Sequence, residues 1–185
     1  MRSAEDLRAR NIKRIAVMPI DSAAAGRADP AGSRPGAEQN AGALLTDFVY
    51  SSMLALPHWQ IVSEREVREV AATVRDGTAQ ARRIGELVYA DAVVVGRVLR
   101  FRQRVGEDLG VQSPASVDFV LELVDVKRGD VVWRAEYQET QKALSENLLG
   151  LGDFTRRGGK WVRAEDLARD GAEKAVRQLN QMLYR

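Results

Sequence analysis

Apolar and polar residues alternate along three consecutive stretches in the second half of the chain, a period of two that is typical of β-strands with one buried face. The stretches are residues 91–104, 116–126 and 131–140. The last two are separated by Lys127-Arg128-Gly129-Asp130, in which Gly and Asp favour a tight reversal of the chain. The pattern predicts an antiparallel β-meander.

The rest of the chain predicts two short strands and four helices. Short apolar runs at residues 15–20 and 59–62 indicate strands. Apolar residues spaced three and four apart indicate helices at 37–56, 78–88 and 164–183, and Ser63 with Glu66 forms a capping pair that opens a further helix to residue 75. The predicted order is β-α-β-α-α-β-β-β-α. We therefore expect a mixed α/β fold, with helices packed on a mixed sheet that ends in the antiparallel meander.

The 185 residues contain no internal repeat and suit one α/β domain spanning 1–185. Residues 1–13 form an N-terminal lead. Residues 22–36 are rich in Ala, Gly and Pro and are expected to form a flexible loop. Residues 141–163 form a long loop that is both apolar and Gly-rich, which is unusual inside a compact domain.

Composition excludes several kinds of chemistry. The chain has 45% hydrophobic and 29% charged residues with a net charge of +2, which is too small to predict a polyanionic partner. Cysteine is absent, so disulfides, thiolate metal sites and thiol nucleophiles are excluded. His58 is the only histidine, so a histidine-based metal cluster cannot be assembled, and we interpret it as a structural or surface residue. We expect no enzyme activity, no metal and no cofactor.

The two faces of the meander have different predicted roles. Arg100, Arg102 and Arg104 share one face and suggest a binding stripe for nucleic acid or a small anionic ligand. Asp118, Glu122, Arg134 and Glu136 lie on the neighbouring strands, however, and favour a solvated ladder of ion pairs instead. The opposite face predicts the core, and truncation of a fully buried Trp133 to Ala would cost about 3 to 5 kcal/mol. The predicted core residues are Val93, Val95, Leu99, Phe101, Phe119, Leu121, Leu123, Trp133 and Tyr137.

Two isolated carboxylates lie at strand ends, where catalytic acids often occur. Asp21 follows the first strand and Asp91 begins the meander. Neither has a partner visible in the sequence, so caps or turns explain them better than a hydrolase, which ranks last among the functional hypotheses. Arg128-Gly129-Asp130 equals the integrin tripeptide, but its place between two complementary strands indicates a hairpin turn.

Three segments carry a resemblance to a known family: RIAVMPID at 14–21, WQIVSERE at 59–66 and ADAVVVGRV at 90–98. In this order they resemble the bacterial cell-envelope lipoproteins related to the curli production assembly and transport component. Similar domains occur in lipoprotein activators of penicillin-binding proteins and at the N-terminal end of the Tol-system propeller protein. The resemblance implies a periplasmic interaction module, tethered to the outer membrane through a lipidated residue upstream of Met1. Residues 105–114 look like a short turn and 141–163 lack sustained alternation, so a pore is not predicted.

The Gly-rich loop at 141–163 is the strongest candidate for partner binding. Its apolar residues must be covered, either by the domain itself or by a protein partner or second copy, and such loops commonly serve recognition. The candidate partner-binding residues are Leu144, Leu148, Leu151, Phe154 and Trp161. The favoured function is a non-catalytic scaffold domain that acts in envelope assembly or export by protein–protein binding, and the alternative is a ligand or nucleic-acid module that uses the arginine stripe.

Overall fold

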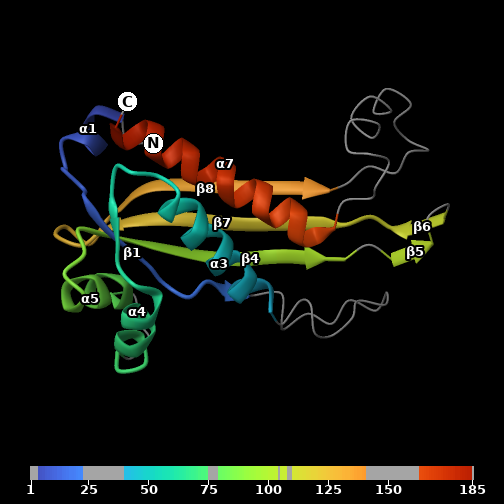
Figure 1. The fold of residues 1–185 in the computed structure, drawn as a ribbon, viewed down its shortest axis with the longest axis horizontal. Helices are drawn as coiled ribbons and strands as arrows, with labels where there is room; N and C mark the ends of the chain where they lie inside the picture. The colour runs from blue at the N-terminus through green and yellow to red at the C-terminus, as the bar shows by residue number, and fades with distance from the viewer. Residues whose placement is uncertain are drawn as a thin grey trace.

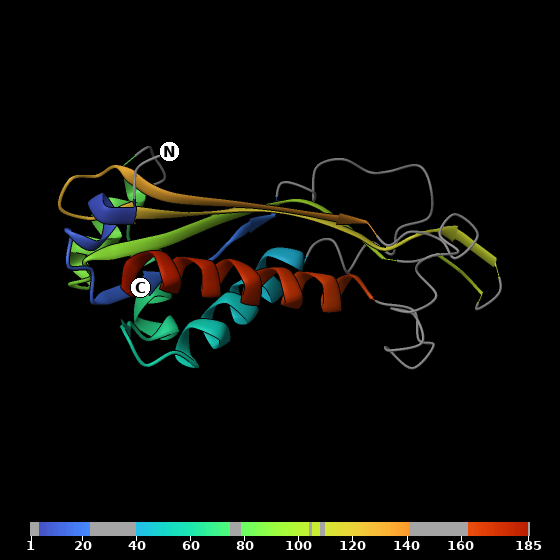
Figure 2. The same ribbon diagram turned by 90° about the horizontal axis from the view of Figure 1, so that it is seen from above.

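The computed structural model of the chain describes residues 4–22, 40–74, 79–103, 105–107, 110–140 and 163–184. One long mixed sheet forms the centre of the molecule, and two helices, α3 (Ala41–Leu54) and α7 (Ala164–Tyr184), run along one of its faces (Figure 1). Seen from above, the other face of the sheet is open along much of its length (Figure 2). This arrangement confirms the predicted mixed α/β fold.

The sheet has the strand order β3-β1-β4-β7-β8, and a short strand β2 (Asp21–Ser22) also pairs with β4. The strands β1 (Arg14–Val17), β3 (Gln60–Ile61) and β4 (Ala92–Arg102) are parallel to one another. β7 (Ser116–Asp125) and β8 (Val131–Thr140) continue from β4 as antiparallel neighbours. The predicted meander is therefore correct in position and in direction.

The remaining helices are short. α4 (Glu64–Ala71) begins at Ser63, whose hydroxyl oxygen accepts the backbone N–H of Glu66 at 3.3 Å, as the capping pair predicted. α5 (Gln80–Leu87) follows as expected. The N-terminal lead contains a helix that the sequence did not predict, α1 (Ala4–Arg8). The expectation of a simple turn at 105–114 is wrong, because β5 (Val105–Glu107) and β6 (Gly110–Ser113) pair there as a small separate sheet.

Two apolar clusters lie on opposite faces of the sheet. The larger fills the space beneath α3 and α7 and includes Phe119, Leu121 and Leu123. The smaller lies between the other face and the helices α4 and α5, and it includes Ala16, Ile84 and Val93. The molecule therefore has three layers at the end where α4 and α5 pack, and two layers at the other end.

The predicted core assignment of β4 needs a correction. The register between β4 and β7 shifts between Val98 and Arg100, so one extra residue interrupts the alternation there. Before the shift, Ala92 and Val94 face the larger cluster, and the predicted core residues Val93 and Val95 face the smaller one. Leu99 is 47% exposed and does not belong to the core. Phe101 lies after the shift and is buried as predicted.

The aromatic residues predicted for the core are confirmed on β7 and β8. Phe119 is fully buried, Trp133 is 5% exposed, and the half-buried Tyr137 stacks on Phe119 with ring centroids 5.1 Å apart. Gly171 of α7 lies directly above this pair. A Cβ atom at Gly171 would meet ring carbons of Tyr137 at 2.7 Å, so the glycine allows α7 to approach the sheet closely.

Candidate functional site

The outer face of the meander carries the predicted ladder of ion pairs. The guanidinium of Arg134 donates to Glu122 across the strands at 2.6 Å and to Glu136 along its own strand at 2.7 Å. Hydrogen bonds to Glu136 and Glu122 raise the pKa of Arg134 above its usual value. Arg100 lies opposite Asp118 in the register, and Arg104 lies outside the described residues. Opposite charges therefore alternate on this face, which favours the ladder over a phosphate-binding stripe.

The isolated polar residues that the sequence highlighted either make contacts that support the fold or lie in solvent. The carboxylate of Asp91 accepts the backbone N–H groups of Lys13 and Arg14 at 2.9 and 2.8 Å, which makes it a cap. Asp21 is exposed in β2. His58 is exposed, stacks on Tyr184 with ring centroids 5.3 Å apart, and lies 3.2 Å from the amide nitrogen of Asn180. Within the described residues, no group of three His, Asp or Glu side chains is arranged to hold a metal ion.

The turn between β7 and β8 is a structural hairpin that is fastened to the N-terminal segment. Gly129 adopts a φ of 72°, and the carboxylate of Asp125 accepts the backbone N–H of Arg128 at 2.9 Å. Arg10 donates to Asp125 at 2.7 Å and to Asp130 at 2.9 Å, and the Arg10 and Asp125 side chains are each only 7% exposed. The integrin-like tripeptide is thus part of a turn, as predicted.

This buried group, which we call the Arg10 clamp (Arg10, Asp125 and Asp130), was not predicted. Burial by itself raises the pKa of Asp125, but the backbone N–H of Arg128 and the guanidinium of Arg10 outweigh that effect, so the pKa lies below its usual value. Arg10 is 115 residues away from Asp125 in the sequence, and no local pattern connects the two.

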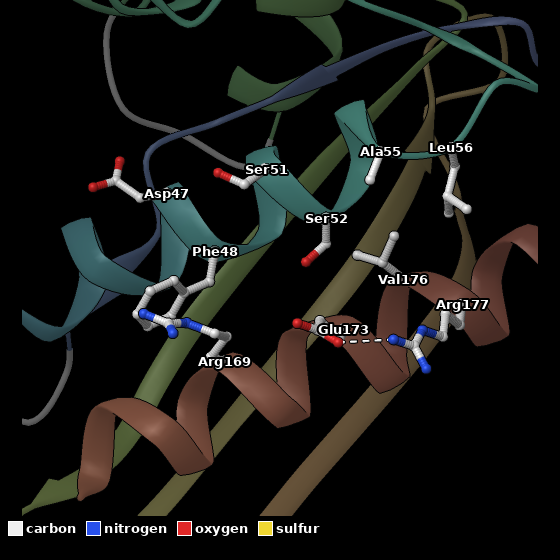
Figure 3. Close-up of a pocket in the computed structure, with 10 residues that line it drawn as sticks. All are labelled: Asp47, Phe48, Ser51, Ser52, Ala55, Leu56, Arg169, Glu173, Val176 and Arg177. Carbon is white, nitrogen blue, oxygen red and sulfur yellow. Dashed lines mark hydrogen bonds and ion pairs between the residues drawn. The ribbon is translucent and has the colours of Figure 1, made fainter.

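A groove between α3 and α7 is the best candidate for a binding site (Figure 3). It has a volume of about 620 Å³ and is open to solvent along the outer surface of the two helices. One turn after another of each helix contributes to its walls. The lining residues are Asp47, Phe48, Ser51, Ser52, Ala55 and Leu56 from α3 and the residues that follow it, and Arg169, Glu173, Val176 and Arg177 from α7.

The groove combines an apolar floor with charged walls. The guanidinium of Arg169 lies over the ring of Phe48, 4.9 Å from its centroid, and so connects the two helices. Glu173 and Arg177 form an ion pair at 2.8 Å one turn further along α7, as Figure 3 shows. Val176 is buried at the base. The lining offers apolar contact, hydroxyl groups and both signs of charge, but no nucleophile paired with a base.

The sequence did not point to this groove, because its two walls are about 120 residues apart along the chain. The apolar stripe predicted for α3 included Phe48 and Leu56, which line the groove, but the stripe was interpreted only as the buried side of the helix. Ser51, Ser52 and Ala55 have small side chains, which leave space along the α3 wall of the groove. That run of small residues was the second local signal, beside the apolar residues Phe48 and Leu56.

The predicted partner-binding residues Leu144, Leu148, Leu151, Phe154 and Trp161 all lie outside the described residues. Of the flexible loop predicted at 22–36, residues 23–36 also lie outside them, and Ser22 belongs to β2. Among the described helices, none is both long enough and apolar enough to cross a membrane.

The chain is similar to known proteins in structure but not detectably in sequence. No family model matches the chain, and no curated protein matches it by sequence. The PelC dodecamer from Paraburkholderia phytofirmans matches with a TM-score of 0.52 and 17% identity, over 95% of this chain and 90% of PelC. The hypothetical protein CT253 from Chlamydia trachomatis matches with a TM-score of 0.57 and 12% identity, over 94% of this chain and 98% of CT253.

The C-terminal domain of LpoB from Salmonella enterica gives a weaker match, with a TM-score of 0.44 and 11% identity over 75% of this chain and 96% of that domain. At identities this low, structural similarity establishes a common fold and no more. The chain has the fold of PelC and CT253, in agreement with the resemblance to envelope lipoproteins that its sequence carries.

Proposed function

We propose that this chain is a non-catalytic interaction domain of the bacterial cell envelope, which acts in envelope assembly or export by protein–protein binding. The observation that supports this proposal is the groove between α3 and α7. Its open shape, apolar floor and mixed charges suit the side chains of another protein, and they lack the convergent polar groups that orient a small substrate.

A second copy of this chain is the occupant that the groove favours. Its walls carry two carboxylates, Asp47 and Glu173, and two guanidinium groups, Arg169 and Arg177. A two-fold axis between two copies can set a carboxylate of one groove opposite a guanidinium of the other, because the groove carries both. The shared fold with PelC, which assembles as a dodecamer, supports association between copies.

The location follows from the resemblance. We propose that the protein works in the periplasm and is held at the outer membrane by a lipid attached upstream of Met1. The candidate residues Leu144, Leu148, Leu151, Phe154 and Trp161 belong to the same proposal as a second contact with a partner. Replacement of Leu148 and Phe154 by Ser is expected to abolish association and leave Tm nearly unchanged, and a collapse of the fold would contradict this role.

The role of the groove in association can be tested with a substitution that fills it. Light scattering during size-exclusion chromatography measures the mass of the wild-type chain as its concentration increases. We expect the wild type to associate and Ser52→Trp to remain a monomer, because an indole at Ser52 projects from the α3 wall and fills the groove. Gln178→Trp is a matched control, since Gln178 is exposed on α7 but does not line the groove. A wild type that stays monomeric, or equal association by both variants, would contradict a contact between copies through this groove.

A further inference from the structure

Tyr89 has an unusual conformation at the end of α5. Its φ is 53°, in the left-handed region that bulky residues rarely adopt, and its side chain is 84% exposed. The backbone N–H of Ala90 donates to the carbonyl of Gly85 at 2.9 Å, and that of Tyr89 donates to the carbonyl of Glu86 at 3.3 Å. These two bonds form a Schellman motif, in which the position of Tyr89 usually holds glycine. The aromatic residue therefore lowers stability at this position and gains no burial in return.

Helix α5 fixes the position of the exposed Tyr89 ring. Ile84 and Val88 are fully buried in the smaller apolar cluster, so the last turn of α5 is firmly packed on the sheet. A Cβ atom at Gly85 would meet the side chain of Val126 at 2.3 Å, which shows how closely α5 approaches the residue that follows β7. Leu87, two residues before Tyr89 in the chain, is also 42% exposed. Two apolar side chains thus project into solvent from a rigid support.

Four basic residues lie at the same end of the molecule as these two side chains. Arg82 and Arg83 of α5 are exposed, and both pair with the single carboxylate of Glu86. Lys127 and Arg128 are exposed in the neighbouring hairpin turn. The side chain of Arg82 passes over that turn, since a Cβ atom on Gly129 would lie 3.2 Å from its Cδ, so the helix and the turn form one end of the molecule (Figure 1). The other carboxylates at this end are Asp6, which lines a cavity with Lys127 and Arg128, Asp91, which caps two backbone N–H groups, and Asp125 and Asp130, which pair with Arg10.

We propose that this end of the molecule, formed by Arg82, Arg83, Leu87, Tyr89, Lys127 and Arg128, docks on the surface of an anionic lipid bilayer. Tyrosine and leucine enter the boundary between headgroups and acyl chains, while arginine and lysine remain at the phosphate level. The four exposed cations outnumber the three exposed carboxylates at this end, Asp6, Glu86 and Asp91, while Asp125 and Asp130 pair with Arg10. This leaves an excess of exposed positive charge for anionic headgroups. Both apolar side chains are exposed, an arrangement that suits insertion into a deformable lipid surface.

The position of the N-terminal segment is consistent with this contact. A polar cavity at the same end is lined by Asp6, Ala9 and Arg10 together with Lys127 and Arg128, so α1 lies beside the hairpin turn. A lipid attached upstream, as proposed above, would hold this end against the membrane. The docking inference does not depend on that lipid, and the test uses the unlipidated chain.

Co-sedimentation with vesicles tests the inference. We expect the chain to bind vesicles of phosphatidylglycerol mixed with phosphatidylcholine, to bind pure phosphatidylcholine vesicles much more weakly, and to dissociate as salt is added. Lys127→Gln and Arg128→Gln are each expected to weaken binding about fivefold. Tyr89→Gly is the sharpest variant, because it should bind several-fold more weakly while its Tm increases by about 2 to 4 °C as the strained position is relieved.

Controls separate this surface from others. Leu99→Ala removes a similarly exposed apolar side chain from the other half of the sheet and should bind vesicles as the wild type does. Ser52→Trp should also bind normally, so a failure of the groove proposal and a failure of this one are distinguishable. The inference is overturned if the wild type does not bind anionic vesicles, if it binds both vesicle types equally, or if Tyr89→Gly binds unchanged. A lower oligomeric mass of Tyr89→Gly without vesicles would assign the surface to a protein contact and would also overturn it.

Discussion

The two faces of the β-meander are built from the same strands and have opposite physical roles. On the inner face, Phe119, Leu121 and Trp133 lie beneath α7 and are almost completely removed from water. On the outer face, Glu122, Arg134 and Glu136 pair with one another in solvent. Burial of apolar area stabilises a fold far more than exposed ion pairs do. The comparison separates the residues that stabilise the domain by burial from those that form ion pairs on its surface.

The inner face should show the largest effect. Trp133→Ala is expected to lower the free energy of unfolding by about 3 to 5 kcal/mol, because it opens a cavity beneath α7. Urea denaturation measures this change. Trp133→Phe is the matched control and should cost less than about 1.5 kcal/mol, since it keeps most of the ring volume and the indole N–H has no hydrogen-bond partner. Equal losses in the two variants would contradict a role based on packing.

The Arg10 clamp sharpens the comparison, because here an ion pair is buried. Arg10→Met leaves the carboxylate of Asp125 buried without its cation and should cost about 3 kcal/mol. The exposed pair between Glu173 and Arg177 provides the control, and Arg177→Met should have little effect on the urea midpoint. If Arg10→Met were equally mild, burial of the clamp would not determine its strength.

The same clamp predicts a dependence on pH. Because the pKa of Asp125 is lower in the folded chain than in the unfolded chain, its stabilisation is complete above the unfolded value of about 3.9 and is lost as the pH falls through the folded value. Urea midpoints measured from neutral pH to pH 3 should therefore fall less steeply below pH 4 for Asp125→Asn than for the wild type. Parallel curves would show that this carboxylate does not contribute.

The outer face should show the smallest effect. Glu122→Gln removes one carboxylate from Arg134, and Glu136 remains to pair with it. We expect a urea midpoint that is unchanged within the error of replicate measurements, because the pair is exposed to solvent and salt. A clear loss of stability would break the proposed division between the two faces.

Much of the fold was predictable because its signals are local. The capping pair at Ser63 and Glu66 correctly placed α4, and the apolar stripe of α7 correctly predicted its buried side. Alternation in β7 and β8 gave the right inner face because polar residues occupy nearly every other position there. In β4, by contrast, apolar residues occupy both parities from Ala92 to Val95, so the pattern could not tell which residues face which layer.

The candidate sites were less predictable because they arise from distant segments or from backbone conformation. The groove joins α3 to α7, and the Arg10 clamp joins the start of the chain to the hairpin, so each requires the tertiary fold. Tyr89 looked like an ordinary residue at the end of a helix, since its importance lies in a dihedral angle. The predicted loop residues at 141–163 remain a prediction.

The shifted register in β4 also bears on how the chain tolerates changes in length. Val98 pairs with Phe119 and Arg100 with Asp118, so Leu99 is the surplus residue that has no counterpart on β7. Its deletion would restore a regular ladder and leave Phe101 opposite Val117, whereas a deletion elsewhere in the strand would turn every following side chain to the wrong layer. Deletion of this one residue is therefore expected to leave the core intact.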